Sequence, residues 1–207
     1  VRDVFVDREL RKRFFIGLTM DFLGMFSYWV FWSWLPSYLE SAYRVGELSM
    51  LNNMFWLIAT QVGALMGYLM YGFAQDHIGR RTSWSIFTAG EGALILLSIF
   101  MIDMLIRGEA LPISLFFVIG FGLGYFTGFW SAFGAILSEL FPTEVRGTVS
   151  GLIFNIGRSI NFVSPIFVGY LAKIYGFGLA LSTASIVCFM MSAIVWLLPE
   201  TKGKELL

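Results

Sequence analysis

The sequence predicts an all-α, multi-pass membrane protein with six transmembrane helices. Apolar residues make up 57% of the 207-residue chain and charged residues 14%, whereas a soluble domain carries about 25% charge. The apolar residues gather in six long runs, and a helix needs about 20 such residues to cross a bilayer. Each run is too long for a barrel strand and none alternates with a period of two, so helices are expected.

The six predicted spans follow one another closely along the chain. They cover residues 14–39, 54–75, 84–106, 112–137, 149–172 and 176–198. The connecting segments are short and rich in polar or turn residues, for example "DHIGRR" and "KIYG". They leave no room for a soluble domain, so we expect a compact helical bundle.

The first, second and fourth spans have features that suit helices packed in a membrane. The first span, "FFIGLTMDFLGMFSYWVFWSWLPSYL", has tryptophans near its later end, where aromatic side chains anchor helices at the membrane interface. The second and fourth spans repeat glycine every four residues, at Gly63 and Gly67 and at Gly120, Gly124 and Gly128. This spacing predicts close approach of helix backbones.

The third and fifth spans each hold charged side chains, and the sixth holds the only cysteine, Cys188. A single cysteine cannot form an intramolecular disulfide, and we expect it to be a small buried hydrophobic residue.

The sequence has no cluster of His, Ser and Cys with catalytic or metal-binding spacing, so we expect neither an enzyme nor a metal or cofactor site. The net charge of zero gives no indication of a nucleic-acid partner.

The positive residues predict the orientation in the membrane. Ten of them fall on one side of the predicted spans and three on the other, with Arg158 between. The ten are Arg2, Arg8, Arg11, Lys12, Arg13, Arg80, Arg81, Arg146, Lys202 and Lys204, and the three are Arg44, Arg107 and Lys173. The positive-inside rule therefore places both termini in the cytoplasm of a cell-membrane protein.

Two loops on the positive side combine acids with arginines. "AQDHIGRRTSW" follows the second span and contains Asp76, Arg80 and Arg81; "SELFPTEVRGTVSG" follows the fourth and contains Glu139 and Arg146. Such pairs at helix ends are candidates for an inner gate that opens when the ion pairs break. The alternative is that the arginines only anchor the topology.

The two loops and the ending "LPETKGKEL" resemble signatures of the major facilitator superfamily. "D-x-x-G-R-R" after the second helix, "E-x-x-P-T-x-x-R-G" after the fourth and "P-E-T-K-G" after the sixth resemble the sugar-porter and related metabolite-symporter branches. The chain is similar to the C-terminal six-helix half of a twelve-helix transporter, and "RELRKR" resembles the end of the linker between the halves. A chain that begins at Val1 suggests a piece of a longer protein, or a processed one.

The resemblance implies a domain organisation. Residues 1–13 would be a cytoplasmic linker, 14–198 the transmembrane half and 199–207 a cytoplasmic tail, with two inverted three-helix repeats at about 14–106 and 112–198. Substrate would bind near the midplane, against an N-terminal half from the same gene or a separate chain. Helices 1, 2, 4 and 5 would line the cavity, and helices 3 and 6 would brace it.

The branch within the superfamily is indicated by a missing motif and two present ones. Sugar porters carry a glutamine pair in the first helix of this half, and no such pair is present. "W-L-P-x-Y-L" and "N-I-G-R" resemble the organic-acid and sialate-type symporters instead. The resemblance therefore favours a carboxylate or sugar acid over a neutral sugar.

Arg158 lies near the centre of the fifth span, with Asn155 and Asn161 three residues to either side. A charge at this depth costs at least about 2.5 kcal/mol, so it needs a partner, a wet cavity or a function. Arg158 is predicted either to bind an anionic substrate bidentately or to neutralise Asp21 or Glu91. Pro165, one turn beyond Asn161, predicts a hinge in this helix.

Asp21 and Glu91 are the two acids inside the predicted spans. A carboxyl group in a poorly solvated cavity can be protonated in one state and release its proton in another, so Asp21 is the first candidate for proton coupling and Glu91 the second. Each has the alternative of a structural role. Tyr28, on the face of Asp21, and Gln61 are further substrate-binding candidates.

These observations predict a secondary active transporter that moves a small polar metabolite, a sugar or an organic or sugar acid, by alternating access with proton symport. The alternative is a non-transporting or homodimerising six-helix half that acts as a sensor or interaction protein.

Overall fold

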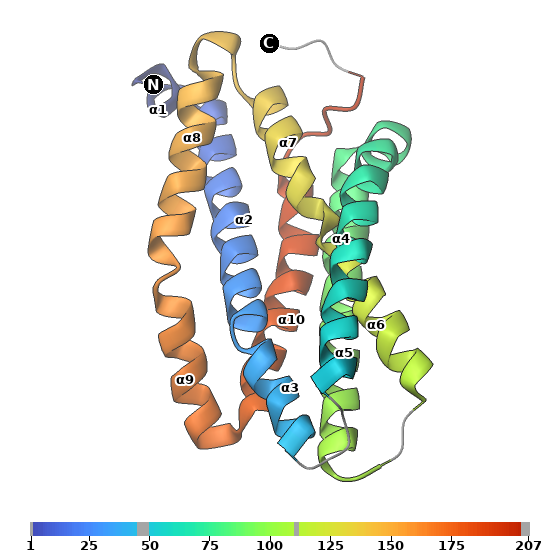
Figure 1. Ribbon diagram of the computed structural model, residues 1–207. Coiled ribbons are helices and arrows are strands. Elements are labelled where there is room, and N and C mark those ends of the chain that lie inside the picture. Colours follow the sequence, from blue (N-terminus) through green and yellow to red (C-terminus); the bar gives the residue numbers. More distant parts are fainter. Residues whose placement is uncertain (1, 45–49, 110–111, 204–207) are drawn as a thin grey trace.

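The computed structural model describes residues 2–44, 50–109 and 112–203, and in these residues the chain is a bundle of long helices without strands (Figure 1). Six helical spans are long and apolar enough to cross a membrane, which confirms the predicted fold class. They are Arg8–Glu40, Asn52–Ile78, Arg80–Ile106, Ser114–Leu140, Thr143–Tyr175 and Phe177–Leu197.

Four of the six spans consist of more than one helix. The helices are α1 (Arg2–Val6), α2 (Arg8–Trp32), α3 (Leu35–Arg44), α4 (Met50–Ile78), α5 (Arg80–Ile106), α6 (Ile113–Phe126), η1 (Thr127–Ser131), α7 (Ala132–Leu140), α8 (Thr143–Ile160), α9 (Val163–Tyr175), α10 (Phe177–Ile194) and η2 (Val195–Leu197). The first span breaks between α2 and α3, the fourth at the 3₁₀ turn η1, and the fifth between α8 and α9. The last break lies just before Pro165, where the sequence predicts a hinge.

The first long helix begins six residues before the predicted span. The side chain of Asp7 caps α2 by accepting hydrogen bonds from the backbone N–H groups of Glu9 and Leu10, at 2.8 and 2.9 Å. This cap satisfies N–H groups that have no partner within the helix. A hydropathy pattern identifies only the apolar part of a helix, so it misses this polar first turn.

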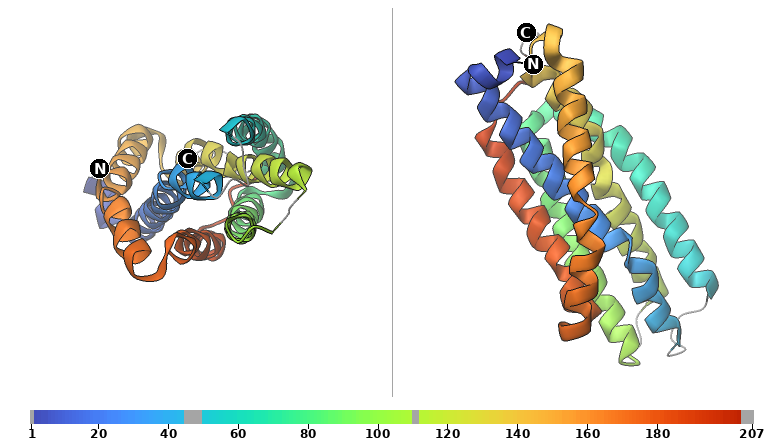
Figure 2. Two further views of the ribbon diagram at one scale, coloured as in Figure 1. Left: turned by 60° about the horizontal axis from the view of Figure 1, so that its bottom comes forward. Right: turned by 90° about the vertical axis from the view of Figure 1, so that its left-hand side faces the viewer.

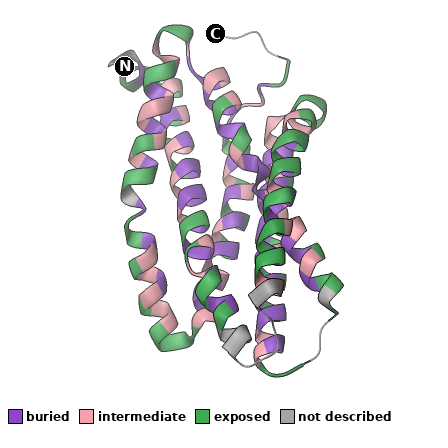
Figure 3. Ribbon diagram, viewed as in Figure 1, coloured by how far each residue is buried: buried purple, intermediate pink, exposed green. Residues whose placement is uncertain are grey.

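The two described ends of the chain, α1 and the segment that ends at Gly203, lie at the same end of the bundle (Figure 1), which we call the terminal end. α2 packs against α8 and α10, α5 against α10, and α4 against α6. Figure 2 shows these helices running side by side along the bundle. α4 is the least buried of the spans (Figure 3), and most of its exposed residues are apolar, as expected where a helix faces lipid or another membrane segment.

α4 and α6 approach so closely that backbone touches backbone. A Cβ atom added to Gly63 or Gly67 would overlap the carbonyl oxygens of α6, and one added to Gly124 would overlap the carbonyl oxygen of Thr60. This confirms the prediction from the glycine spacing. The contact fixes α4 against α6, the first part of the fourth span, where that helix leads into η1.

Replacing Gly67 by Val is expected to lower the midpoint of thermal unfolding by about 5–10 °C, because overpacking costs about 1–3 kcal/mol and a protein of this size shifts about 2–4 °C per kcal/mol. Gly72→Val, in the same helix, is the matched control, since no described atom lies within 4 Å of its added Cβ. Fluorescence-monitored melting of both variants in detergent measures the difference. Equal stability of the two variants would contradict the packing argument.

Candidate functional site

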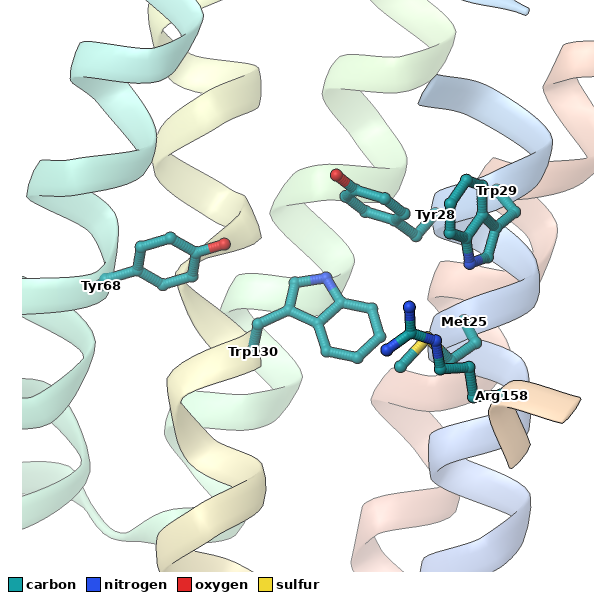
Figure 4. A pocket seen from close by; sticks show the side chains of 6 residues that line it. All are labelled: Met25, Tyr28, Trp29, Tyr68, Trp130 and Arg158. Carbon is teal, nitrogen blue, oxygen red and sulfur yellow. The ribbon is translucent and has the colours of Figure 1, made fainter. Parts of the chain in front are cut away.

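A pocket of about 230 Å³ opens on the bundle between its first, second, fourth and fifth spans (Figure 4). Its lining residues are Met25, Tyr28, Trp29, Tyr68, Trp130 and Arg158. They come from α2, α4, η1 and α8. These are the four spans that the resemblance implies as the lining of a cavity.

Local helix geometry explains which side chains reach the pocket. Met25, Tyr28 and Trp29 are spaced by three and four residues, so they share one face of α2. Trp130 belongs to η1, and the tighter winding of a 3₁₀ turn within a helix often occurs at functional sites. Arg158 lies in the last turn of α8, directly before the break between α8 and α9.

The guanidinium group of Arg158 points into the pocket toward Trp130 (Figure 4). Within the described part of the chain it forms no ion pair with Asp21 or Glu91. Neutralisation of Asp21 or Glu91, one of the two predicted roles of Arg158, is therefore not seen among the described residues.

Asp21 is fully buried between α2 and α8, and neither of its carboxylate oxygens has a hydrogen-bond partner among the described residues. A Cβ atom on Gly157 would overlap Oδ2 of Asp21, so the absence of a side chain at Gly157 makes room for the carboxyl group. Asp21 lies one turn before Met25 on α2. It is therefore adjacent to the pocket but does not line it.

Glu91 is also buried, at 2% exposure, and lies away from the pocket. It accepts a hydrogen bond from the thiol of Cys188, at 3.6 Å, and the Cys188 sulfur lies 3.0 Å from the hydroxyl of Ser27. These contacts link α5, α10 and α2. Cys188 is buried, as predicted, but it packs within a polar cluster rather than among apolar groups alone.

The other predicted substrate-binding residues do not all meet at one place. Asn155 is exposed and donates to the carbonyl of Gly151, at 2.7 Å, so it does not share a cavity wall with Arg158 in the pockets described. Asn161 is buried and donates to the carbonyl of Gly157, at 2.7 Å. The helix breaks at Asn161, and the amides of Asn155 and Asn161 satisfy backbone carbonyls.

Two further pockets adjoin the Arg158 pocket. Asn161 lines a second pocket of about 270 Å³ together with Trp29, Arg158, Phe162 and Pro165. Gln61 and Tyr28 line a narrow polar pocket of about 50 Å³ between α2, α4 and α6, with Trp32, Thr60, Ala64, Tyr68, Gly124 and Thr127. Arg158 and Tyr28 are thus each shared by two pockets.

Two of the predicted acids, Asp76 and Glu139, pair with Arg80 at the terminal end of the bundle. Arg80 binds Glu139 bidentately, with Nη2 to Oε1 at 2.7 Å and Nε to Oε2 at 3.0 Å. It also pairs with Asp76, whose Oδ1 lies 3.0 Å from Nη1. One guanidinium group thereby joins the end of α4, the start of α5 and the end of α7. Arg146 donates near the start of its own helix, to the carbonyl of Phe141 at 3.4 Å.

Glu200, which the sequence interpretation did not select, completes this cluster. Its carboxylate accepts hydrogen bonds from the backbone N–H groups of Arg80 and Arg81 at the first turn of α5, at 3.0 and 3.2 Å, and those of Thr201 and Lys202. The Thr201 hydroxyl donates to Glu139. Partial burial alone would raise the pKa of Glu200, but the four N–H donors outweigh it and hold the pKa below its usual value.

Replacing Glu200 by Gln is expected to lower the unfolding midpoint at pH 7 by roughly 2–4 °C. A carboxyl whose pKa is lower in the folded state contributes stability above its usual pKa of 4.5 and loses that contribution as pH falls through the folded value. The difference between wild type and variant should therefore shrink toward pH 3. Melting curves at both pH values test this, with the exposed Glu109→Gln as control. A difference that is the same at both pH values would contradict the capping role.

The sequence matches the family described as "Sugar (and other) transporter" over residues 1–207. The chain belongs to this family of the major facilitator superfamily. The match confirms the resemblance carried by the two loops and the ending "LPETKGKEL". Together with the six apolar helices, it identifies a multi-pass membrane protein of a transporter family.

Curated relatives in this transporter family include proteins named for organic acids. A Cupriavidus pinatubonensis protein named "Probable 4-methylmuconolactone transporter" is 34% identical, with 82% of this chain and 37% of the relative covered. The cis,cis-muconate transport protein of Acinetobacter baylyi is 28% identical, with 92% and 44% covered. The sialic acid transporter NanX of Escherichia coli is 28% identical, with 79% and 37% covered. The chain spans less than half the length of these relatives.

Proposed function

We propose that the chain is the C-terminal half of a secondary active transporter that moves a small organic acid across the cell membrane by alternating access, in symport with protons. The observation that carries this proposal is the Arg158 guanidinium, directed into a mid-bundle pocket and unpaired with a protein acid in the described residues. An N-terminal six-helix half would close the open side of the pocket.

A carboxylate is the substrate group that suits Arg158 best. The planar guanidinium matches a carboxylate in geometry and charge, and the two groups can form a pair of charge-assisted hydrogen bonds. The names of two relatives, for cis,cis-muconate and sialic acid, support the same class of substrate. Tyr28 lines the same pocket, and Asn161 and Gln61 line the adjoining ones, so substrate contact through them is part of the proposal; Asn155 would reach substrate only after a rearrangement of α8.

Asp21 is the proposed proton carrier. It is buried without a counter-charge or hydrogen-bond partner among the described residues, one turn from the pocket, and such a site favours a neutral carboxylic acid over a carboxylate. Opening of the α2–α8 contact would hydrate it and let the proton leave. Glu91 is the second candidate, but its hydrogen bond to Cys188 also supports a structural role.

The terminal end is proposed to face the cytoplasm, because the sequence assigns ten of its fourteen basic residues to the side of the predicted spans on which this end lies. The cluster of Asp76, Arg80, Arg81 and Glu139 would then hold the cytoplasmic ends of α4, α5 and α7 together. Arg146 would contribute from the start of α8. We propose that these contacts act as an inner gate that loosens when the cavity opens to the cytoplasm.

Uptake into proteoliposomes that contain the complete gene product tests the proposed function. The probes are labelled benzoate, cis,cis-muconate and sialic acid, with glucose as the neutral control. We expect at least one acid to accumulate above its external concentration when an inward proton gradient is imposed, and a protonophore to abolish this accumulation. Uptake that ignores the gradient would contradict proton coupling, and a stable homodimer of this chain without uptake of any probe would favour the sensor alternative.

A further inference from the structure

Trp130 presents a polar atom that lacks a partner at the wall of the Arg158 pocket. Its indole Nε1 is buried, and no hydrogen-bond acceptor among the described residues binds it. An indole N–H can only donate, and a buried donor without an acceptor is destabilising. The position of Trp130 on the pocket wall makes a ligand the natural source of the missing acceptor.

Two phenols lie on the same side of the pocket as this indole N–H. Figure 4 shows the Tyr68 hydroxyl directed toward Trp130, and the indole nitrogen on the side of the ring that faces Tyr28 and Tyr68. The rings of Tyr28 and Trp130 are in edge contact, with centroids 5.9 Å apart. Arg158 faces the opposite part of the Trp130 ring. The pocket therefore has a cationic pole at Arg158 and a neutral, hydrogen-bonding pole at Tyr28, Tyr68 and Trp130.

The wall between the two poles is aromatic. Trp29 packs edge-on against Tyr28, with centroids 5.8 Å apart, and Met25 adds a polarizable thioether beside Arg158. Flat aromatic faces suit a planar, unsaturated ligand better than a polyol, because offset and edge-to-face contacts need a second π system and a polyol would lose hydration without gaining partners.

We propose that this pocket selects monocarboxylates that have a planar, unsaturated body and a neutral hydrogen-bond acceptor at the end opposite the carboxylate. This inference rests on the proposed function and defines its substrate class. Arg158 binds the carboxylate, the aromatic wall contacts the body, and Trp130 donates to the distal acceptor, which can be a carbonyl, a hydroxyl or a ring nitrogen.

A second carboxylate at the distal end is disfavoured. The described residues that line the pocket include one cation, Arg158, and the distal pole consists of neutral groups. A buried carboxylate without a cationic partner is costly, whereas a neutral acceptor needs only the N–H that Trp130 offers. The pocket is therefore expected to bind carboxylates with a neutral acceptor at the distal end most tightly, those with an apolar distal end less tightly, and those with a charged distal end most weakly.

Calorimetric titration of the purified complete gene product with three compounds of similar shape tests this order. Isonicotinate has a ring nitrogen opposite its carboxylate, benzoate has a C–H there, and terephthalate has a second carboxylate. We expect isonicotinate to bind about five- to tenfold more tightly than benzoate, as one net hydrogen bond allows, and terephthalate to bind more weakly than both.

Two indole variants assign this selectivity to a single N–H group. Trp130→Phe should reduce the isonicotinate-to-benzoate affinity ratio to about one. Trp34→Phe is the matched control, because the Trp34 indole N–H is also buried and without a partner but lies outside the described pockets. This variant should leave the affinity ratio unchanged. If Trp130→Phe is poorly folded by melting temperature, Tyr68→Phe provides a second test of the distal pole, with the exposed Tyr170→Phe as its control.

The outcomes separate this inference from the proposed function. Equal affinities for isonicotinate and benzoate, a ratio that survives both Trp130→Phe and Tyr68→Phe, or terephthalate binding as tight as that of isonicotinate would each overturn the inferred class. In those cases, loss of binding of both monocarboxylates in Arg158→Gln would still support the carboxylate site. If none of the three acids binds, both proposals fail.

Discussion

Replacing Arg158 by Gln is expected to reduce uptake of an organic acid, measured well below saturation, by about 100-fold. Hydrogen bonds to a charged group contribute about 1.5–3 kcal/mol each, and every 1.4 kcal/mol corresponds to a factor of ten in binding. Glutamine keeps part of the side-chain length but loses both the charge and the two-pronged donor. Initial rates of labelled benzoate uptake into proteoliposomes measure the effect.

The conservative variant and a distant arginine make this result specific. Arg158→Lys retains the charge but not the planar fork, so an intermediate loss of roughly tenfold is expected. Arg8→Gln removes an exposed arginine at the start of α2, outside the described pockets, and should transport as the wild type does. If Arg158→Gln and Arg158→Lys lose transport equally and both melt at lower temperature, Arg158 stabilises the fold and does not bind substrate.

The fold was largely predictable because its determinants are local and repetitive. Six apolar runs indicate six spans, and glycine at every fourth residue indicates the α4–α6 contact that the structure confirms. The helix ends were less predictable, since Asp7 extends α2 by a polar turn. The break of the fourth span at η1 has no proline or charge to indicate it and depends on packing against other helices.

The candidate site was predictable where it depends on charge and not where it depends on neutral groups. Arg158 is conspicuous because an arginine is rare at mid-membrane depth. Trp130 is one of seven tryptophans, and only its position in η1 distinguishes it. Glu200 had a usable signal, because the N-terminus of a helix that begins with two arginines favours a nearby anion. The tail that carries Glu200, however, is distant from α5 in the sequence.

Replacing Asp21 by Asn is expected to abolish proton-driven accumulation of the substrate while leaving exchange of labelled for unlabelled substrate within about twofold of wild type. Asparagine has nearly the same volume and can remain in the same buried site, but it cannot release a proton. A carrier that no longer exchanges a proton can still change between its outward-open and inward-open conformations with substrate bound. Accumulation under an imposed proton gradient, compared with counterflow without one, measures the two activities separately.

The packing of Asp21 against Gly157 supplies an independent test of the same assignment. Gly157→Ala would force its Cβ into the space of Oδ2, so either the carboxyl group or α8 must move, and accumulation should fall although Asp21 is still present. Gly151→Ala in the same helix is the matched control, because no described atom lies within 4 Å of its added Cβ. If Asp21→Asn still accumulates substrate and Glu91→Gln does not, proton coupling belongs to the buried cluster of Glu91 and Cys188. The contact between α2 and α8 would then only bury a neutral carboxyl group for structural reasons. Gly157→Ala should in that case change the stability of the fold rather than proton coupling.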